Sequence, residues 1–169
     1  MHWDSDEELY GAVRRGLFTA VVGDVMDTMG LLRQFLPPQI KPLRNDMVVI
    51  GRAVTVLEAD VFAESSGPSA TDFMLEPFGL MFRALDDLKA GEVYICTGGS
   101  PRYALWGGLM STRAIKLGAA GAVVDGYHRD TRGITHTPSR SPKTMSPGIT
   151  FTPPISRGTR KSMTFPRGA

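Results

Sequence analysis

The stretch LWGGLMSTRAIKLGAAGAVVDGYHRD, residues 105–130, constrains the fold of this 169-residue chain more than any other segment. Its pattern predicts a helix over about 107–117, a glycine-rich turn, and a strand over 122–125, followed by Arg129 and Asp130. The helix and the strand would run antiparallel through this short turn. The start of the helix, whose backbone N–H groups attract anions, would therefore lie near the residues that follow the strand.

We predict a small pocket at this place. Gly107 to Met110 would form an anion cradle, Arg129 would supply a fixed cation, and Asp130 could ligate a metal. An Arg-Asp pair after a strand can equally be a surface ion pair, which contributes little to stability. The neighbouring glycines favour the pocket, because Gly107 and Gly108 let a ligand approach the backbone closely.

Length and composition are typical of one globular domain. With 42% hydrophobic and 21% charged residues, the chain can bury a core of ordinary size. No apolar run approaches the ~20 residues that span a bilayer, and the acidic start MHWDSDEELYG lacks the apolar centre of a signal peptide. The single cysteine, Cys96, excludes an internal disulfide. We therefore expect a cytoplasmic protein without a membrane span.

The charges are unevenly divided along the chain. Residues 1–130 hold all 17 acidic and 12 of the 19 basic residues, whereas 131–169 hold the other 7 basic residues, no acid and 6 of the 12 prolines. A basic arm can bind nucleic acid, but a segment without hydrophobic periodicity is better interpreted as disordered. We predict a folded domain over 1–134, a basic, proline-rich tail over 135–169, and no nucleic-acid partner.

The rest of the chain alternates between strand and helix patterns. Helices are expected over 7–15, 20–29 and 73–88. Residues 47–59 are expected to form either one strand bent at Gly51 or two short strands, and 93–97 a further strand. This alternation predicts an α/β fold, in which helices cover a sheet. Runs such as VVIGRAVTV and AGAVVDG predict strands that are buried on both faces. Because GxGxxG is absent, we expect no nucleotide cofactor.

Other polar residues are weaker candidates for a functional role. His128 could act as a base, but strand alternation points it away from Arg129. Asp24 and Asp27 share a helix face at i and i+3 and could ligate a metal, although a solvated helix face is the simpler interpretation. Asp125 ends a buried strand, where we expect it to hydrogen-bond the backbone near the pocket.

Five segments together carry a family resemblance: TAVVGDVMDTMG, GRAVTV, LKAGEVYIC, ALWGGLMSTRAIKLGAAGAVVDGYHRD and TRGI. Over about residues 8–134 the chain resembles the family of the regulator of ribonuclease activity A. This family also contains the class II 4-hydroxy-4-methyl-2-oxoglutarate aldolases. The resemblance implies a swivelling β/β/α-type domain, here with an incomplete C-terminal part. It also implies a homotrimer or hexamer whose active sites lie between subunits.

In the aldolase members, an acidic residue precedes an Arg-Asp pair by twenty intervening residues. The resemblance implies that Arg129 is catalytic and binds the substrate, and that Asp130 holds Mg²⁺ or Mn²⁺. It implies that the substrate, a small keto acid, also contacts four consecutive residues: Gly107, Gly108, Leu109 and Met110. The metal would stabilise the enolate formed when the C–C bond breaks to release pyruvate, and oxaloacetate decarboxylation would be a side activity.

This chain departs from the aldolase pattern at Gly108, which stands where those members carry the acid. A glycine supplies no carboxylate, so we expect weakened metal binding and impaired activity. The sequence favours a metal-dependent lyase, and the alternative is a non-catalytic, trimeric, protein-binding regulator of the same fold, such as a ribonuclease inhibitor. A third possibility is a defective gene product without present function.

The tail departs from the family pattern as well. Relatives continue after the Arg-Asp pair with a Pro-Val-Phe strand and further strands, and no such continuation is visible here. Codons that encode this tail, shifted by one base, can encode a family-like continuation. We therefore predict that the residues from about Thr137 onward are either disordered or translated out of frame.

Overall fold

The structure is a computed structural model that describes residues 2–60, 80–99, 102–136 and 148–151. Its elements, in chain order, are α1 (Asp6–Gly16), α2 (Thr19–Thr28), β1 (Lys41–Pro42), β2 (Arg52–Leu57), α3 (Met81–Asp86), β3 (Glu92–Thr97), β4 (Ala104–Trp106), α4 (Gly108–Leu117), β5 (Gly121–Val124), β6 (Tyr127–His128), α5 (Thr131–His136) and β7 (Gly148–Phe151). The first part of the helix predicted over 73–88 lies outside the described residues.

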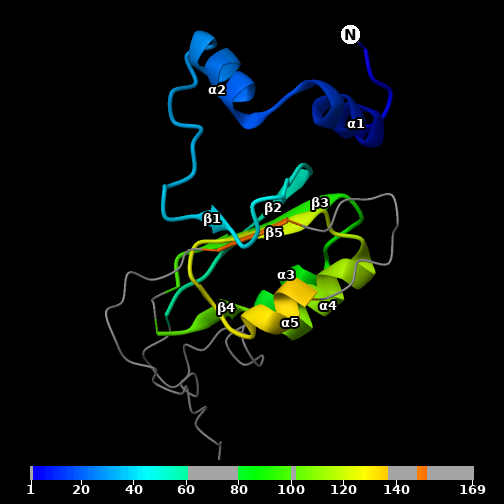
Figure 1. Ribbon diagram of the computed structural model, residues 1–169. Helices are drawn as coiled ribbons and strands as arrows, with labels where there is room; N and C mark the ends of the chain where they lie inside the picture. Colours follow the sequence, from blue (N-terminus) through cyan, green and yellow to red (C-terminus); the bar gives the residue numbers. More distant parts are fainter. Residues whose placement is uncertain (1, 61–79, 100–101, 137–147, 152–169) are drawn as a thin grey trace, which may run out of the picture.

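A five-stranded sheet in the order β1-β7-β5-β3-β2 forms the centre of the fold. Its strands β2, β3, β5 and β7 run parallel, and β1 pairs antiparallel with β7. Figure 1 shows α3, α4 and α5 together on one side of this sheet, and α1 and α2 on the other side. The predicted α/β fold, a sheet covered by helices, is confirmed. None of the described helices combines the length and the apolar character that a membrane span requires.

The core lies between the sheet and the three helices α3, α4 and α5. Because side chains alternate along a strand, Tyr94 and Cys96 on β3 face the helices together with Ala122 and Val124 on β5. All four are at most 1% exposed. The ring of Tyr94 packs against Trp106 at a centroid distance of 5.2 Å and an angle of 52°, a favourable tilted arrangement for two aromatic rings.

The two apolar runs differ in their burial. All four residues of β5 are buried, as predicted. The prediction for β2 is wrong, because β2 is an edge strand: Ala53 and Thr55 are exposed, and Leu57 is 81% exposed. A strand with a neighbour on one side only cannot be covered as completely as a central strand. The sequence of an apolar run does not reveal its place in the sheet.

Local capping chemistry sets two helix ends. Ser5 caps α1, and its hydroxyl accepts a hydrogen bond from the Glu8 amide at 3.2 Å. Gly118 ends α4 in the left-handed conformation, at φ +79°, which glycine adopts without strain. The predicted succession of helix, glycine turn and strand over 107–125 is confirmed.

Two described elements lie where the sequence indicated no regular structure. Thr131–His136 forms α5, and Gly148–Phe151 forms β7, which inserts between β5 and β1. Four residues are too few to show a periodic pattern, and β7 is defined by backbone pairing with strands distant in the sequence. Residues 137–147 and 152–169 lie outside the described part of the chain. The domain boundary at 134/135 and the shifted reading frame stay predictions.

Two buried polar atoms lack hydrogen bonds within the described residues, one on Glu58 just after β2 and one on Tyr94 of β3. Among the described residues, neither the Oε1 atom of Glu58 nor the hydroxyl of Tyr94 has a partner. Burial raises the pKa of Glu58 above its usual range, because the charged carboxylate loses hydration there. Ionised Glu58 therefore destabilises the folded chain.

We predict that Glu58→Gln changes how stability depends on pH. The folded protein holds the Glu58 proton more tightly than the unfolded chain, so this contribution is fully present below the unfolded pKa and is lost as pH rises through the folded pKa. Denaturant unfolding at pH 4 and pH 7 should show Glu58→Gln gaining stability over the wild type at the higher pH. Glu7→Gln, on the exposed part of α1, serves as the control. A gain that is equal at both pH values would contradict this account.

Candidate functional site

The pairing of β4 with β6 builds the candidate site. These strands are parallel, Trp106 lies opposite His128, and the Arg129 N–H donates to the Trp106 carbonyl oxygen at 3.1 Å. The glycine pair 107–108 follows β4 and therefore lies beside Arg129 and Asp130, which follow β6. The sequence predicted this convergence but attributed it to the strand over 122–125. In the structure, a separate two-stranded sheet brings the two pairs together.

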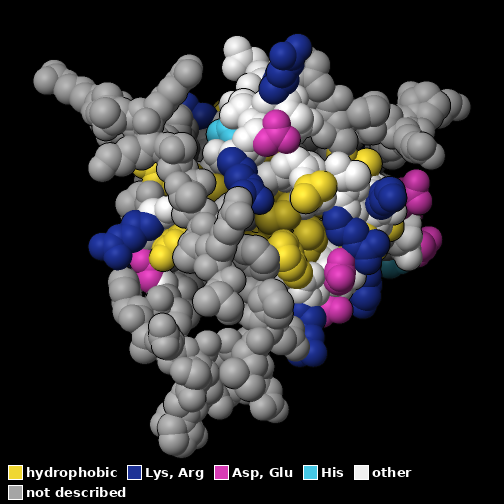
Figure 2. Space-filling model, turned by 90° about the horizontal axis from the view of Figure 1, so that it is seen from below, with side chains coloured by type: hydrophobic (Ala, Val, Ile, Leu, Met, Phe, Trp, Pro, Cys, Tyr) yellow, Lys and Arg dark blue, Asp and Glu magenta, His cyan; other side chains and the backbone are white. Residues whose placement is uncertain are grey.

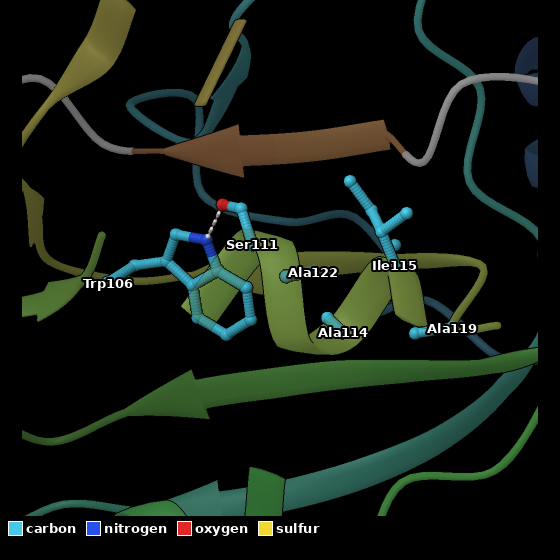
Figure 3. A pocket seen from close by; sticks show the side chains of 7 residues that line it. Trp106, Ser111, Ala114, Ile115, Ala119 and Ala122 are labelled. Carbon is cyan, nitrogen blue, oxygen red and sulfur yellow. Dashed lines mark hydrogen bonds between the residues drawn. The ribbon is translucent and has the colours of Figure 1, made fainter. Parts of the chain in front are cut away.

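A buried hydrogen-bond chain fixes the start of α4. The indole Nε1 of Trp106 donates to Ser111 Oγ at 2.8 Å, and this hydroxyl donates to the Gly107 carbonyl oxygen at 3.2 Å. Trp106 and Ser111 are each 1% exposed. Figure 3 shows this pair at one end of a narrow pocket. Small apolar side chains on α4 and β5, such as Ala114 and Ala122, line that pocket, which is therefore a gap in the packing and not the predicted anion site.

Arg129 is exposed and lies along the first residues of α4. A Cβ atom added to Gly107 would lie 3.4 Å from Cγ of Arg129 and 3.5 Å from its Nε atom. The arginine side chain thus contacts the glycine directly. A guanidinium in this position can pair with an anionic group that approaches the helix start.

Asp130 caps α5. Its backbone is left-handed at φ +60°, its Oδ1 atom accepts a hydrogen bond from the Gly133 amide at 3.1 Å, and its carbonyl oxygen accepts one from the Ile134 amide at 3.0 Å. A Cβ atom at either Gly108 or Gly133 would overlap Oδ2 of Asp130. The carboxylate therefore fits between two glycines, and it already serves as the helix cap.

The four residues expected to hold a substrate differ in what they present. Leu109 is 84% exposed, whereas Met110 is 7% exposed and packs in the core. The helical position of Met110 points its side chain to the sheet, and substrate binding at residues 107–110 stays a prediction. Gly107 and Gly108 offer backbone only, and Gly107 is buried.

His128 is half-buried, and its Nε2 atom lies 2.8 Å from Thr131 Oγ1. Burial lowers the pKa of His128, because the charged imidazolium loses hydration there. A neutral imidazole that is hydrogen-bonded to Thr131 supports the turn between β6 and α5. His128 therefore contributes to the geometry of this turn.

The other acidic candidates lie apart from Asp130 in the described structure. Asp24 and Asp27 are exposed on α2, on the far side of the sheet in Figure 1. Asp125 accepts a hydrogen bond at Oδ2 from the Thr97 hydroxyl at 2.9 Å. The expected hydrogen bond from Asp125 to the backbone stays a prediction. None of these carboxylates is described in contact with Asp130.

The described residues do not fit a resident divalent cation. Asp130 supplies one carboxylate, its Oδ1 atom is engaged by Gly133, and Gly108 supplies none. No group of three or more His, Cys, Asp or Glu side chains within the described ranges could hold a metal ion. Mg²⁺ and Mn²⁺ prefer several oxygen ligands in near-octahedral geometry, which this set does not provide.

Sequence inspection overlooked the capping role of Asp130. The local sequence Asp130-Thr131-Arg132-Gly133 places an aspartate three residues before the amide it binds, which is the spacing of a helix N-cap. The signal was therefore present in the sequence. The close approach of the carboxylate to Gly108, twenty-two positions earlier, depends on the pairing of β4 with β6 and left no such signal.

We predict an order of stability for substitutions of Asp130. Asn should retain most of the stability, because its amide oxygen can accept the Gly133 N–H and it tolerates a positive φ. Ala should destabilise the protein by about 1–2 kcal/mol, because it loses the cap and keeps a Cβ atom in the left-handed region. Gly should fall between them. Denaturant unfolding measures the order, and an alanine variant as stable as the wild type would refute the capping role.

Comparison with known proteins places the chain in a family. A model of the RraA-like family, described as Aldolase/RraA, matches residues 19–143. No curated protein matches significantly. A structure described as novel cellulases from microbes associated with the gut ecosystem superposes at a TM-score of 0.70, with 28% identity, over 94% of this chain and 64% of that one.

Two further structures are RraA proteins. RraAS2 of Streptomyces coelicolor, an unusual member of the RNase ES inhibitor RraA family, has 20% identity and a TM-score of 0.64, with 89% of this chain and 65% of that one covered. The RNA-processing inhibitor RraA from Thermus thermophilis has 26% identity and a TM-score of 0.51, with 76% and 64% covered. The chain thus spans slightly less than two thirds of the length of these relatives. Because the family model matches well over half of its residues, the chain belongs to the RraA-like family.

Proposed function

We propose that this chain is a non-catalytic member of the RraA-like family that acts by binding another protein. One observation carries the proposal: the only carboxylate described at the site, that of Asp130, caps α5 between two glycines. In the aldolase members that the chain resembles, an acid would stand at Gly108. A metal-stabilised enolate needs a cation held beside the substrate, and the described donor set does not fit one.

The remaining residues of the site suit binding. Arg129 presents an exposed guanidinium beside the start of α4, and Leu109 adds an exposed apolar side chain. A cation next to an apolar surface can contact a protein partner without any chemical step. Arg129 and Leu109 can attract a protein partner, but neither of these side chains can act as a general base.

The names of two relatives indicate the class of partner. The Thermus protein is described as an RNA-processing inhibitor, and the Streptomyces protein as a member of an RNase inhibitor family. We extend this description to the present chain as a proposal. Its partner would then be an endoribonuclease of the E type, and the chain would inhibit RNA cleavage as a homo-oligomer, in the form of a trimer or hexamer.

A metal-dependent lyase that releases pyruvate is the second candidate. It is favoured by one observation: Arg129 and Asp130 lie beside the start of α4, as the resemblance to the aldolases requires. Mg²⁺ or Mn²⁺ bound to Asp130 would supply electrophilic stabilisation, and Arg129 would hold the keto acid. Glycoside hydrolysis, suggested by the cellulase description, requires two carboxylates that flank the substrate, whereas the described site offers one.

The lyase and the binding protein predict different results with keto acids. We expect no release of pyruvate from oxaloacetate or 4-hydroxy-4-methyl-2-oxoglutarate above background, with or without Mg²⁺ or Mn²⁺. We also expect no saturable Mn²⁺ binding by electron paramagnetic resonance, because one engaged carboxylate is a poor ligand set. Metal-dependent release that disappears in Arg129→Ala would refute the proposal and support the lyase. Arg113→Ala, an exposed arginine paired with Asp86, is the matched control.

Inhibition of a ribonuclease tests the binding function directly. Cleavage of a labelled single-stranded RNA by a purified E-type endoribonuclease should slow as the concentration of this protein increases. The effect should saturate, because a specific complex forms at one surface. An unchanged cleavage rate at a large molar excess, together with no complex in sedimentation experiments, would rule out this partner class.

A further inference from the structure

Helix α2 presents apolar side chains that no described residue covers. Phe18, Val25 and Met29 follow helical spacing and lie on one side of α2. Leu32 lies just beyond the end of the helix. The exposures of these four side chains are 66%, 52%, 68% and 71% in chain order, and we call them the α2 face. Contiguous exposed apolar surface of this kind marks an interaction site.

The first part of the chain has no core of its own. Between residues 2 and 50, all of which the structure describes, Gly23 is the only buried residue. The ring of Phe35, in the connector between α2 and β1, packs on Gly23, where a Cβ atom would overlap it. This contact joins the connector to α2 and leaves the α2 face in water. Burial of the face therefore requires apolar side chains from another segment or molecule.

The last residues of the chain start beside this connector. Phe151 ends β7 and lies opposite Lys41, the residue at which the connector enters β1. Eighteen residues follow Phe151, and we call residues 152–169 the C-terminal segment. The connector covers the distance from Lys41 back to Met29 in twelve residues. Eighteen residues that start at the same point are therefore long enough to reach the α2 face.

The C-terminal segment combines apolar and basic side chains. Its larger apolar residues are Ile155, Met163 and Phe165. Met163 and Phe165 are separated by one residue, so an extended backbone places both on the same side. The segment contains no acidic residue and four basic ones, which are Arg157, Arg160, Lys161 and Arg167.

Charge favours the α2 side of the sheet over the α4 side. Residues 2–36 hold six acidic and three basic residues, whereas residues 102–136, which include α4 and α5, hold five basic and two acidic residues. Figure 2 views the molecule from the side of α4 and α5 and shows Lys and Arg around the apolar side chains there. A basic segment is therefore attracted to the side of α1 and α2 and repelled from the other side.

We infer that the C-terminal segment packs on the α2 face of its own chain, with Met163 and Phe165 against the apolar side chains. The segment is joined to the sheet at Phe151, so its effective concentration at the face is about millimolar, and a few apolar contacts are enough to hold it. The contact lies on the opposite side of the sheet from α4 and does not depend on the proposed function (Figure 1). A protein that binds α2 would have to displace the segment first.

Substitutions in the full-length chain test whether the segment covers the face. In the double variant Met163→Ser and Phe165→Ser, amide hydrogen exchange over residues 18–32 should become about tenfold faster, because the cover is weakened. Binding of the dye anilinonaphthalene sulfonate, which reports exposed apolar surface, should increase. The double variant Thr152→Ser and Thr159→Ser, which keeps the apolar residues of the segment, is the matched control and should behave as the wild type.

A peptide supplies the cover from outside. A synthetic peptide with the sequence of residues 152–169, added at millimolar concentration to the Met163→Ser and Phe165→Ser variant, should restore slow exchange over 18–32 and reduce dye binding. The same peptide with both serines should have no effect. Exchange and dye binding that are equal in the variant and the wild type would overturn the inference, and would agree with a C-terminal segment that packs nowhere.

Disulfide trapping locates the contact. Met29→Cys combined with Phe165→Cys should yield a cross-link within one chain on oxidation, seen as a faster monomer band on non-reducing gels, because the two side chains would meet. Leu109→Cys combined with Phe165→Cys is the matched control, since Leu109 is 84% exposed on α4, on the other side of the sheet. Equal linkage in both pairs would overturn the inference. Linkage between chains that increases with protein concentration would overturn it as well, and would assign the cover to a second copy.

Discussion

The pairing of two short parallel strands, β4 and β6, holds the candidate site together. One hydrogen bond, from the Arg129 amide to the Trp106 carbonyl oxygen, joins residues that are twenty-three positions apart at the point where both strands end. The glycines that follow β4 and the Arg-Asp pair that follows β6 are adjacent because of this pairing. The buried Trp106–Ser111 hydrogen bond then fixes where α4 begins, so that both sides of the site are tied to the core.

This arrangement gives Asp130 a structural role that competes with metal binding. Its carboxylate caps α5 and occupies the space that side chains at positions 108 and 133 would need. Asp130 can therefore take this position only because residue 108 is a glycine without a side chain. A second carboxylate at this place would have to displace the first, so the site retains the positive charge of Arg129 without the ligand set of a metal enzyme.

The protein belongs to a family whose description joins aldolases with RraA proteins, and the binding role is our proposal for it. Apolar side chains on α2 and at the start of α4 lie on opposite sides of the sheet, where the described residues leave both in contact with water. Exposing apolar side chains to water costs free energy unless another segment or molecule covers them.

Local sequence determined helices α1, α2 and α4, the Ser5 cap of α1 and the turn at Gly118, because capping residues and helical periodicity act within a few positions. It also placed the glycine pair 107–108 near Arg129, and the family resemblance agreed with the fold. Tertiary structure alone decided that β2 is an edge strand, that 148–151 joins the sheet as β7, and that Asp130 contacts Gly108. Each of these depends on which strands become neighbours, and strand pairing between distant segments leaves no periodic trace in either one.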